Sequence, residues 1–252
     1  MSFAVAADAY DRFMGRYSVP LAAPFADFAG VSTGQRVLDV GCGPGALTAE
    51  LVRRLGTSAV SAVDPSRSFV EAMESRHPEV DVQRAPAEQL PFGDDDFDAT
   101  LAQLVVHFLP DPVAGVREMA RVTRAGGIVA ACVWDHAGSD GPLSPFWQAA
   151  HDLDPEVADE SELPGAREGH LAELFEAAGL REVEDGDVAV TVRHPTFDDW
   201  WEPYTLGVGP AGAYVAGLDP GRREELRERC RERLAATPIV LTARAWATRG
   251  RP

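Results

Sequence analysis

The stretch VLDVGCGPGALTAEL, residues 37–51, combines an apolar run, an acidic residue, three closely spaced glycines and the start of an amphipathic segment. The glycines are Gly41, Gly43 and Gly45. Such a turn lets a ligand approach the backbone closely, and the free N–H groups of the helix that follows face that ligand. With Ala46 the stretch also fits the pattern G-x-G-x-x-A, so a dinucleotide is one candidate ligand.

Asp39 stands two residues before the first glycine and discriminates between candidate ligands by charge. An ionised carboxylate a few ångströms from a dinucleotide pyrophosphate would cost several kcal/mol at intermediate dielectric. A ligand with an ammonium and a sulfonium group would instead be stabilised there. S-adenosylmethionine carries both charges, and its carboxylate suits the N–H groups at the helix start. Asp39 therefore favours S-adenosylmethionine, a choice that the glycines alone leave open.

Two further acids follow the next apolar stretches of the chain. Asp64 ends the stretch AVSAV nineteen residues after Gly45, where a doubly wound fold places an acid that binds the ribose hydroxyls of an adenine nucleoside. This spacing suits either cofactor. Glu88 follows the third stretch after a turn of small residues, and it could face the adenine amino group.

Candidates for acid–base chemistry are His107, in LVVHFLPD, and Asp135. Either could take a proton from an acceptor hydroxyl, and a structural role for His107 is an equally open interpretation. Cys42, between two glycines, is interpreted as a small apolar packing residue. The other histidines show no mutual metal-ligand spacing, so no metal site is predicted.

Alternation of apolar runs and amphipathic segments predicts the elements that position these residues. Strands are expected at 36–40, 59–63, 80–84, 97–103 and 127–134, and helices at about 46–55, 66–76 and 112–123. This alternation predicts an α/β fold with a parallel, doubly wound sheet.

The N-terminal segment and the second half of the chain have a less regular pattern of apolar residues. Residues 8–29 have aromatic and aliphatic residues at helical spacing, interrupted by Pro20 and Pro24. Residues 135–167 have little periodicity and suggest a loop or partial cap, and a helix is expected at about 168–178. Strands at 183–193 and 238–246 are expected at a sheet edge, because apolar and polar residues alternate in both. The segment between these strands is an insertion.

Composition excludes several classes of function. The 252-residue chain has a formal net charge of −17, which disfavours nucleic-acid partners. Glutamates alternate with the arginines of segment 222–233, and this pattern predicts a salt-bridged surface helix. All 23 basic residues are arginine, so lysine-dependent Schiff-base and P-loop chemistry is excluded. Three widely spaced cysteines and no long apolar run favour a cytoplasmic protein with no membrane span.

Five stretches in order resemble the class I S-adenosylmethionine-dependent methyltransferases, in the small-molecule branch similar to the UbiE and type 11 families. They are VLDVGCGPG, VDPS, APAEQLPFGDDDFD, LVVHFLPDP and REMARVTRAGGIVA. The resemblance implies a Rossmann-like sheet of seven strands, mostly parallel with an antiparallel last strand, carrying small cap insertions. It also implies methyl transfer from S-adenosylmethionine, with S-adenosylhomocysteine as product.

The resemblance also implies a set of cofactor-binding residues. Asp39 and the glycine turn would hold the methionyl end, Asp64 the ribose, and Gln103, through its backbone, the methionine moiety. The full set is Asp39, Gly41, Cys42, Gly43, Gly45, Asp64, Pro65, Ser66, Ala87, Glu88 and Gln103. The segment YDRFMGRY resembles a lid over the cofactor, and its expected contacts are Tyr10, Met14, Arg16 and Tyr17.

The predicted organisation is an N-terminal helical lid over residues 1–30 and a methyltransferase domain over 31–252, with cap insertions at about 137–167 and 194–237. Candidate acceptor-binding residues are Tyr10, Trp134, Trp200, Trp201 and Tyr204. The last three could equally form the core that docks the insertion.

The predicted function is methyl transfer to a small-molecule acceptor by in-line displacement. The alternatives are a nicotinamide-dependent oxidoreductase and a cofactor-binding protein without turnover. The identity of the acceptor, the atom that is methylated and the oligomeric state stay open.

Overall fold

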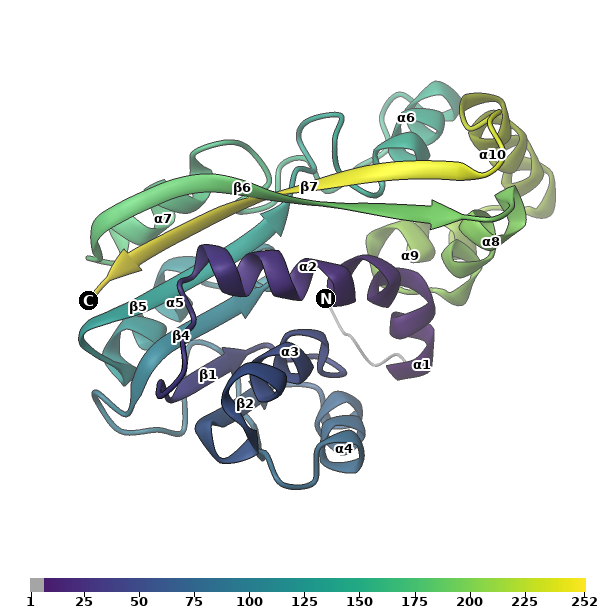
Figure 1. Ribbon diagram of the computed structural model, residues 1–252. Coiled ribbons are helices and arrows are strands. Elements are labelled where there is room, and N and C mark those ends of the chain that lie inside the picture. The colour runs from purple at the N-terminus through teal and green to yellow at the C-terminus, as the bar shows by residue number, and fades with distance from the viewer. Residues whose placement is uncertain (1–6) are drawn as a thin grey trace.

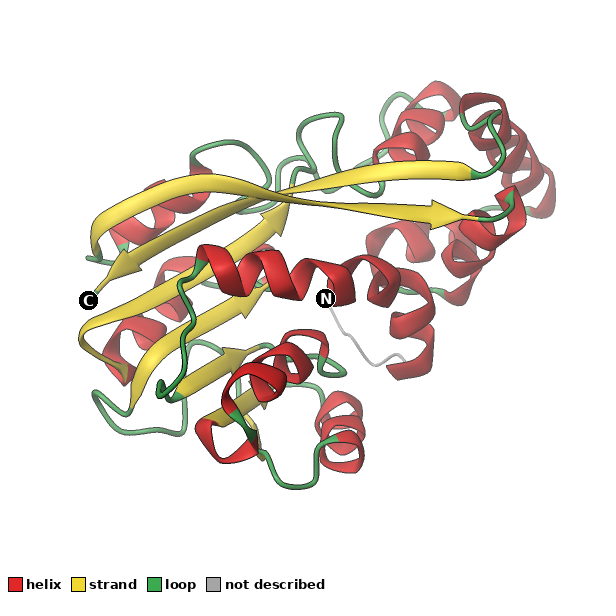
Figure 2. Ribbon diagram, viewed as in Figure 1, coloured by secondary structure: helices red, strands yellow, loops and turns green. Residues whose placement is uncertain are grey.

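The fold is built on a seven-stranded sheet, and the computed structural model describes it with its helices over residues 7–252 (Figures 1 and 2). The strands are β1 (Val37–Val40), β2 (Val60–Asp64), β3 (Asp81–Arg84), β4 (Phe97–Gln103), β5 (Thr123–Trp134), β6 (Arg181–His194) and β7 (Ile239–Arg251). They lie in the order β3-β2-β1-β4-β5-β7-β6. Neighbours are parallel except at β7, which is antiparallel to β5 and β6. The predicted fold class is confirmed.

Helices cover both faces of the sheet because the central strands are apolar on both sides. These elements are α2 (Arg16–Phe28), α3 (Ala46–Leu55), α4 (Arg67–Arg76), α5 (Pro112–Val122) and α7 (His170–Ala177), with short turns η2 (Thr57–Ala59) and η3 (Val106–Phe108). Successive residues of β1 point to opposite faces: Val37 belongs to the core beneath α2 and α3, and Leu38 to the core beneath α5 and α7.

The N-terminal segment forms one helical path through α1 (Ala7–Tyr10), a π-helical turn η1 (Asp11–Gly15) and α2. The prediction that Pro20 and Pro24 interrupt this run is wrong, because both lie inside α2. Each proline removes one backbone donor, but the buried side of α2, with Leu21 and Phe25, packs into the core and keeps the helix intact. Residues 1–6 of the predicted lid lie outside the described residues.

Strand β7 lies inside the sheet, between β5 and β6, so its predicted place at the edge is wrong. Strand β6 forms that edge, as Figure 1 shows. Alternation of apolar and polar residues means that one face of a strand is solvent-exposed, and an internal antiparallel strand can have the same pattern as an edge strand.

The two predicted insertions lie together at the end of the sheet where the parallel strands finish (Figure 1). The first contains α6 (Ser144–Leu153), and the second contains α8 (Phe197–Trp201), η4 (Glu202–Leu206), α9 (Gly209–Gly217) and α10 (Pro220–Arg233). Helix α6 packs against α10. Arg227, Arg229 and Arg231 of α10 form ion pairs with glutamates of the same helix, which confirms the predicted salt-bridged helix.

Candidate active site

A large cavity, here called the main cavity, lies at the carboxyl ends of β1, β2 and β4 and has a volume of about 820 Å³. The order of the strands reverses between β1 and β4, and ligands of open α/β sheets bind at such a switch point. The predicted residues that line it are Tyr10, Asp39, Gly41, Cys42, Gly43, Asp64, Pro65, Ser66, Ala87, Glu88 and Gln103. The structure thus brings most of the residues predicted for the cofactor to one cavity.

The three glycines of the turn lie in different steric environments. All three have positive φ, and a side chain on Gly41 would come within 2.5 Å of Val105. Gly45 is the N-cap of α3 and does not line the main cavity, and a Cβ there would lie 2.3 Å from the Met73 sulfur. At Gly43 a Cβ would meet no atom within 4 Å. The open space in front of Gly43 is therefore where a ligand can contact the backbone.

Asp39 is almost completely buried, with 1% of its surface exposed, at the inner wall of the main cavity. Thr48 Oγ1 donates a hydrogen bond of 2.6 Å to its Oδ2. Burial, together with the nearby Asp64 carboxylate, raises the pKa of Asp39 to about 7, although the Thr48 hydrogen bond opposes the shift. A cation at this wall would favour the ionised form of Asp39.

Asp64, at the end of β2, is held by two backbone donors. Gly43 N–H donates to one carboxylate oxygen at 2.9 Å, and Ser66 N–H donates to the other at 2.8 Å. Burial raises its pKa, and the two hydrogen bonds oppose that shift. Each oxygen keeps a second lone pair that can accept a hydrogen bond from a ligand hydroxyl.

Two polar atoms on the wall of the main cavity are buried without a hydrogen-bond partner among the described residues: Ser18 Oγ and Gln103 Oε1. The Gln103 amide donates to the Ser18 carbonyl at 2.9 Å, which joins β4 to α2. Leaving such groups unpaired is costly, so both suit a polar ligand group. Ser18 was not predicted, because nothing in the local sequence indicates that α2 faces β4.

A second, smaller cavity, here called the inner cavity, adjoins the main cavity and has a volume of about 30 Å³. Tyr10, Leu104 and Phe108 line both cavities and form their shared wall. Leu104 has a φ of 62°, an uncommon conformation for a branched residue that is found most often at functional sites.

The inner cavity also contains two adjacent imidazoles, His107 from η3 and His136 from the segment after β5. Their ring centres lie 5.5 Å apart. Burial lowers the pKa of His136 to about 4 and that of His107 well below its usual value. Both rings are therefore neutral near pH 7, and His107 Nδ1 and His136 Nε2 have no hydrogen-bond partner among the described residues.

Glu160 completes the polar part of the inner cavity, and only 3% of its surface is exposed. Trp147 Nε1, from α6, donates to its Oε2 at 2.8 Å. Burial raises the pKa of Glu160 to about 7. Neither His136 nor Glu160 was predicted as a site residue. Both lie near or inside a segment interpreted as an irregular cap, and only the tertiary fold brings them to His107.

The remaining predicted acceptor residues, together with Met14 of the predicted lid, divide into two groups. Trp134 and Met14 line the inner cavity, and the Trp134 indole N–H donates to the Met14 sulfur at 3.3 Å. Trp200, Trp201 and Tyr204 line neither cavity. They belong to a buried aromatic cluster in which Tyr204 stacks on Phe146 with ring centres 4.5 Å apart. The structure thus places these three in the core that docks the second insertion.

Arg16 and Tyr17 also lie away from both cavities, although they were predicted as lid contacts. Arg16 Nη1 donates to His194 Nδ1 and to the Asp199 carbonyl, each at 2.8 Å. Since Arg16 can only donate, His194 Nε2 carries the proton and donates to the Tyr17 hydroxyl at 2.9 Å. This network fastens α2 to the second insertion.

Asp135, the other candidate base, lies outside both cavities. Its Oδ1 accepts hydrogen bonds from Gly138 N–H at 2.9 Å and from Trp246 Nε1 at 3.1 Å. Its role is to fix the chain after β5.

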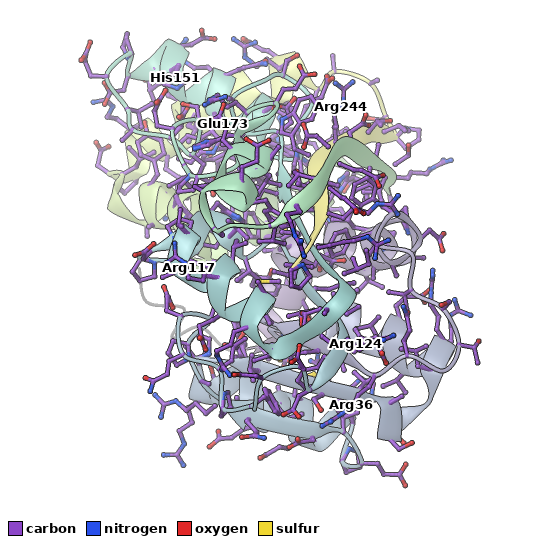
Figure 3. The ribbon with its side chains drawn as sticks, turned by 90° about the vertical axis from the view of Figure 1, so that its left-hand side faces the viewer. Arg36, Arg117, Arg124, His151, Glu173 and Arg244 are labelled. Carbon is purple, nitrogen blue, oxygen red and sulfur yellow. The ribbon has the colours of Figure 1, made fainter. Side chains whose placement is uncertain are left out.

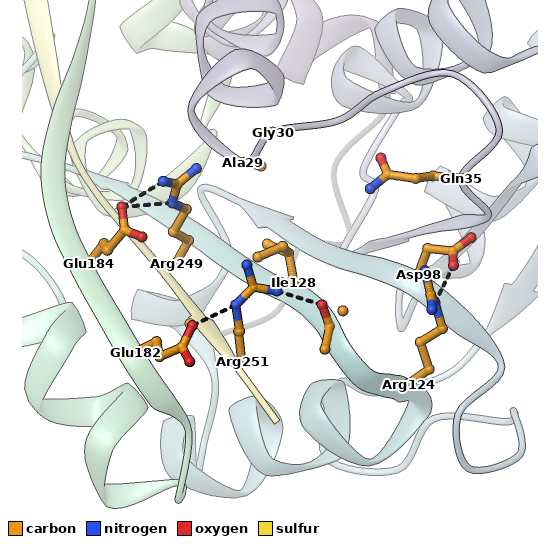
Figure 4. A pocket seen from close by; sticks show the side chains of 13 residues that line it. Ala29, Gly30, Gln35, Asp98, Arg124, Ile128, Glu182, Glu184, Arg249 and Arg251 are labelled. Carbon is orange, nitrogen blue, oxygen red and sulfur yellow. Dashed lines mark hydrogen bonds and ion pairs between the residues drawn. The ribbon is translucent and has the colours of Figure 1, made fainter.

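Another hollow, of about 280 Å³, lies at the opposite end of β4 from the main cavity (Figure 4). Its arginines are paired with acids: Arg124 with Asp98, Arg249 with Glu184, and Arg251 with Glu182. Arg36 lies near Arg124 in Figure 3, and its backbone N–H donates to Asp98 at 2.6 Å. Because these charges are neutralised locally, the hollow lacks the free positive charge of an anion site.

The strand order, the antiparallel β7 and the glycine turn next to an acid-ended β2 define the class I methyltransferase fold. A family model described as a methyltransferase domain, type 11, matches residues 38–131. The chain belongs to this family of class I S-adenosylmethionine-dependent methyltransferases. Within the described residues, no helix is long and apolar enough to cross a membrane.

Related proteins support this assignment. An uncharacterized protein of Mycobacterium tuberculosis is 31% identical over 188 residues, which cover 69% of this chain and 67% of the relative. An uncharacterized methyltransferase of the same organism is 38% identical, covering 50% of this chain and 49% of the relative. A chloroplastic 2-methyl-6-phytyl-1,4-hydroquinone methyltransferase of Oryza sativa is 33% identical, covering 59% and 40%. The match thus spans about half the length of some of these relatives.

Among solved structures, the YcgJ protein of Bacillus subtilis is similar in fold, with a TM-score of 0.57 and 22% identity. The match covers 92% of this chain and 99% of that chain.

Proposed function

We propose that the chain transfers a methyl group from S-adenosylmethionine to a small-molecule acceptor by in-line displacement. The observation that carries this proposal is the convergence of Asp39, Gly43 and Asp64 on one cavity, together with the unpartnered Ser18 Oγ and Gln103 Oε1 on its wall. These groups fit the cofactor, because they offer acceptors for its ammonium and ribose hydroxyls and a bare backbone for close approach.

In the proposed arrangement Asp39 and Gln103 hold the methionyl ammonium, and Asp64 accepts from the ribose hydroxyls. Pro65 and Ser66 flank the adenine, and Ala87 and Glu88 lie at its amino edge. This arrangement is supported by the presence of all these residues on the main cavity.

When bound, the cofactor supplies a methyl group on a positively charged sulfonium and leaves as a neutral thioether, so the protein need not stabilise a departing anion. The chain then acts by positioning the acceptor and excluding water. We place the acceptor in the inner cavity, because this cavity meets the main cavity at Tyr10, Leu104 and Phe108. His107 lies beside the acceptor as a neutral imidazole.

The N-terminal segment to residue 30 is proposed as the lid, since Tyr10 forms part of both cavity walls. A small-molecule acceptor is supported by the small, largely apolar inner cavity and by the name of the rice relative, a hydroquinone methyltransferase. The proposed location is the cytoplasm, whose reducing conditions suit three free, buried cysteines.

Calorimetric titration with S-adenosylhomocysteine tests the cofactor assignment. Asp64→Asn should weaken binding by about tenfold or more, because it removes a charged acceptor for the ribose hydroxyls. Glu74→Gln, an equal charge change on the exposed side of α4, should leave binding unchanged. Thermal unfolding of each variant checks that the fold is retained.

Unchanged binding in Asp64→Asn, or NADH binding in place of S-adenosylhomocysteine, would contradict the proposal. Turnover is tested by release of S-adenosylhomocysteine in the presence of acceptor candidates. Cofactor binding without release across a broad panel would favour a protein that binds the cofactor without turnover.

A further inference from the structure

The inner cavity, which adjoins the proposed cofactor site, contains a carboxyl group of the cap that has no role in the proposed function. Glu160 is buried, lines this cavity and is oriented by the Trp147 indole. His107 and His136 each present in the same region a buried nitrogen that has no hydrogen-bond partner within residues 7–252. The rest of the lining is apolar or aromatic, including Phe13, Met14, Trp134 and Leu143.

We propose that the inner cavity binds an acceptor with an apolar body and a hydroxyl group, and that Glu160 accepts the proton of that hydroxyl during methyl transfer. This inference rests on the proposed function. In the step, the acceptor O–H bond breaks and its proton passes to a Glu160 carboxylate oxygen. The oxygen forms a bond to the methyl carbon, the sulfur–carbon bond breaks, and its electron pair stays on sulfur.

A hydroxyl fits this set of groups better than an ammonium does. The two imidazoles are neutral and can each donate or accept one hydrogen bond to an uncharged oxygen. A cation in this cavity would have Glu160 as its main charged partner. It would also exchange its water shell for an apolar lining, and this desolvation costs free energy. The aromatic lining suits a phenol-like body.

Among the titratable groups of the inner cavity, Glu160 has the pKa that best suits a general base. Trp147 donates to it, Asp159 repels its ionised form, and Tyr204 lies close enough to interact with its charge. Tyr10 has a raised pKa and stays protonated near neutral pH. A general base works best when its pKa is near the working pH, and burial brings the Glu160 pKa to about 7.

The cavity volume of about 30 Å³ leaves room for roughly two water molecules, so an acceptor can enter only when the walls separate. The wall contributed by the second insertion begins at Val208 and Gly209. Gly207 and Gly209 both have positive φ, and a Cβ at either would meet no atom within 4 Å. Glycine adopts this backbone conformation without strain, so we infer that the wall separates at this short segment.

Binding of phenol, toluene and benzylamine to the protein saturated with S-adenosylhomocysteine tests the inference without turnover. Tryptophan fluorescence is the readout, because Trp134 lines the cavity and Trp147 contacts Glu160. Phenol should bind about tenfold or more tightly than toluene, since it gains a hydrogen bond to a charged group. Glu160→Gln should reduce this preference about tenfold and leave toluene unchanged. Glu162→Gln, an exposed neighbour, is the matched control.

The pH dependence gives a second test that does not depend on a variant. Phenol binding to the wild-type protein should weaken as pH falls through about 7, because protonated Glu160 accepts a hydrogen bond less strongly, whereas toluene binding should stay constant. This dependence should disappear in Glu160→Gln. Once an acceptor is known, the methylation rate of the wild-type protein should fall in the same way as pH drops through about 7, and this fall should be absent in Glu160→Gln.

Equal affinities for phenol and toluene, a phenol preference that survives Glu160→Gln, or tighter binding of benzylamine than of phenol would each overturn the inference. Failure of S-adenosylhomocysteine to bind would instead overturn the proposed function, so the two failures are distinguishable.

Discussion

At the scale of single residues, the charge state of Asp39 links the cofactor to pH. Discrimination by charge requires this carboxylate to be ionised, but burial raises its pKa to about 7. A bound ammonium lowers the pKa of a neighbouring carboxyl, so in the proposed arrangement ligand binding should expel the proton that Asp39 carries.

Binding of S-adenosylhomocysteine near pH 7 should therefore release roughly half a proton, and affinity should rise between about pH 6 and 7.5. Calorimetry in buffers of different ionisation enthalpy measures the proton release directly. Asp39→Asn should bind more weakly and release no proton. Proton uptake, or release that persists in Asp39→Asn, would contradict this account.

Alanine substitutions at two glycines of the turn should affect ligand binding and stability to different extents. Gly43→Ala points a methyl group into the main cavity, so S-adenosylhomocysteine binding should fall sharply while the left-handed backbone costs about 1–2 kcal/mol. Gly45→Ala has the same backbone cost plus a clash with Met73, so its free energy of unfolding should fall further. Calorimetry and urea unfolding measure the two effects, and a larger stability loss at Gly43 would contradict the assignment.

Residue types and local spacing were sufficient to predict the glycine turn, Asp39 and Asp64, because each belongs to a strand end or its following turn. Ser18, His136 and Glu160 could not be predicted in this way. Each becomes part of a cavity wall only through contacts between segments far apart in the chain, such as the Gln103 hydrogen bond to Ser18.

At the scale of elements, α2 is fastened to the second insertion through a buried imidazole. Arg16→Ala would leave His194 Nδ1 without its donor and should reduce the free energy of unfolding by about 1–3 kcal/mol. Arg12→Ala removes an exposed ion pair with Glu202 and should cost about 0.5 kcal/mol or less. Urea unfolding measures the free energy of unfolding of both variants. Equal losses would show that the buried network contributes no more to stability than the exposed ion pair.

Element types were predicted well where one pattern dominates and poorly where tertiary packing decides. The bounds of α3 and β4 agree with the predicted 46–55 and 97–103. The break at Pro20 and Pro24 was wrong because burial of α2 outweighs two missing donors. Helix α6 was missed because the glycine- and proline-rich residues around it hide its short apolar face.

At the scale of the whole molecule, the cap is assembled from two insertions that are distant in sequence. Helix α6 of the first packs against α10 of the second, and the aromatic cluster of Phe146, Trp200 and Tyr204 buries their contact. The sequence predicts both insertions, but their pairing follows from the antiparallel β7, which returns the chain from the cap into the middle of the sheet.

The wall shared by the two cavities has a thermodynamic consequence. Tyr10, Leu104 and Phe108 bound both spaces. If the proposed ligands occupy the two cavities, a ligand that fixes these side chains on one side should change the free energy of binding on the other. Such coupling is reciprocal: the factor by which the cofactor product alters acceptor affinity must equal the factor by which the acceptor alters affinity for the product. This equality holds for equilibrium affinities, and the order in which the two ligands bind depends on rates.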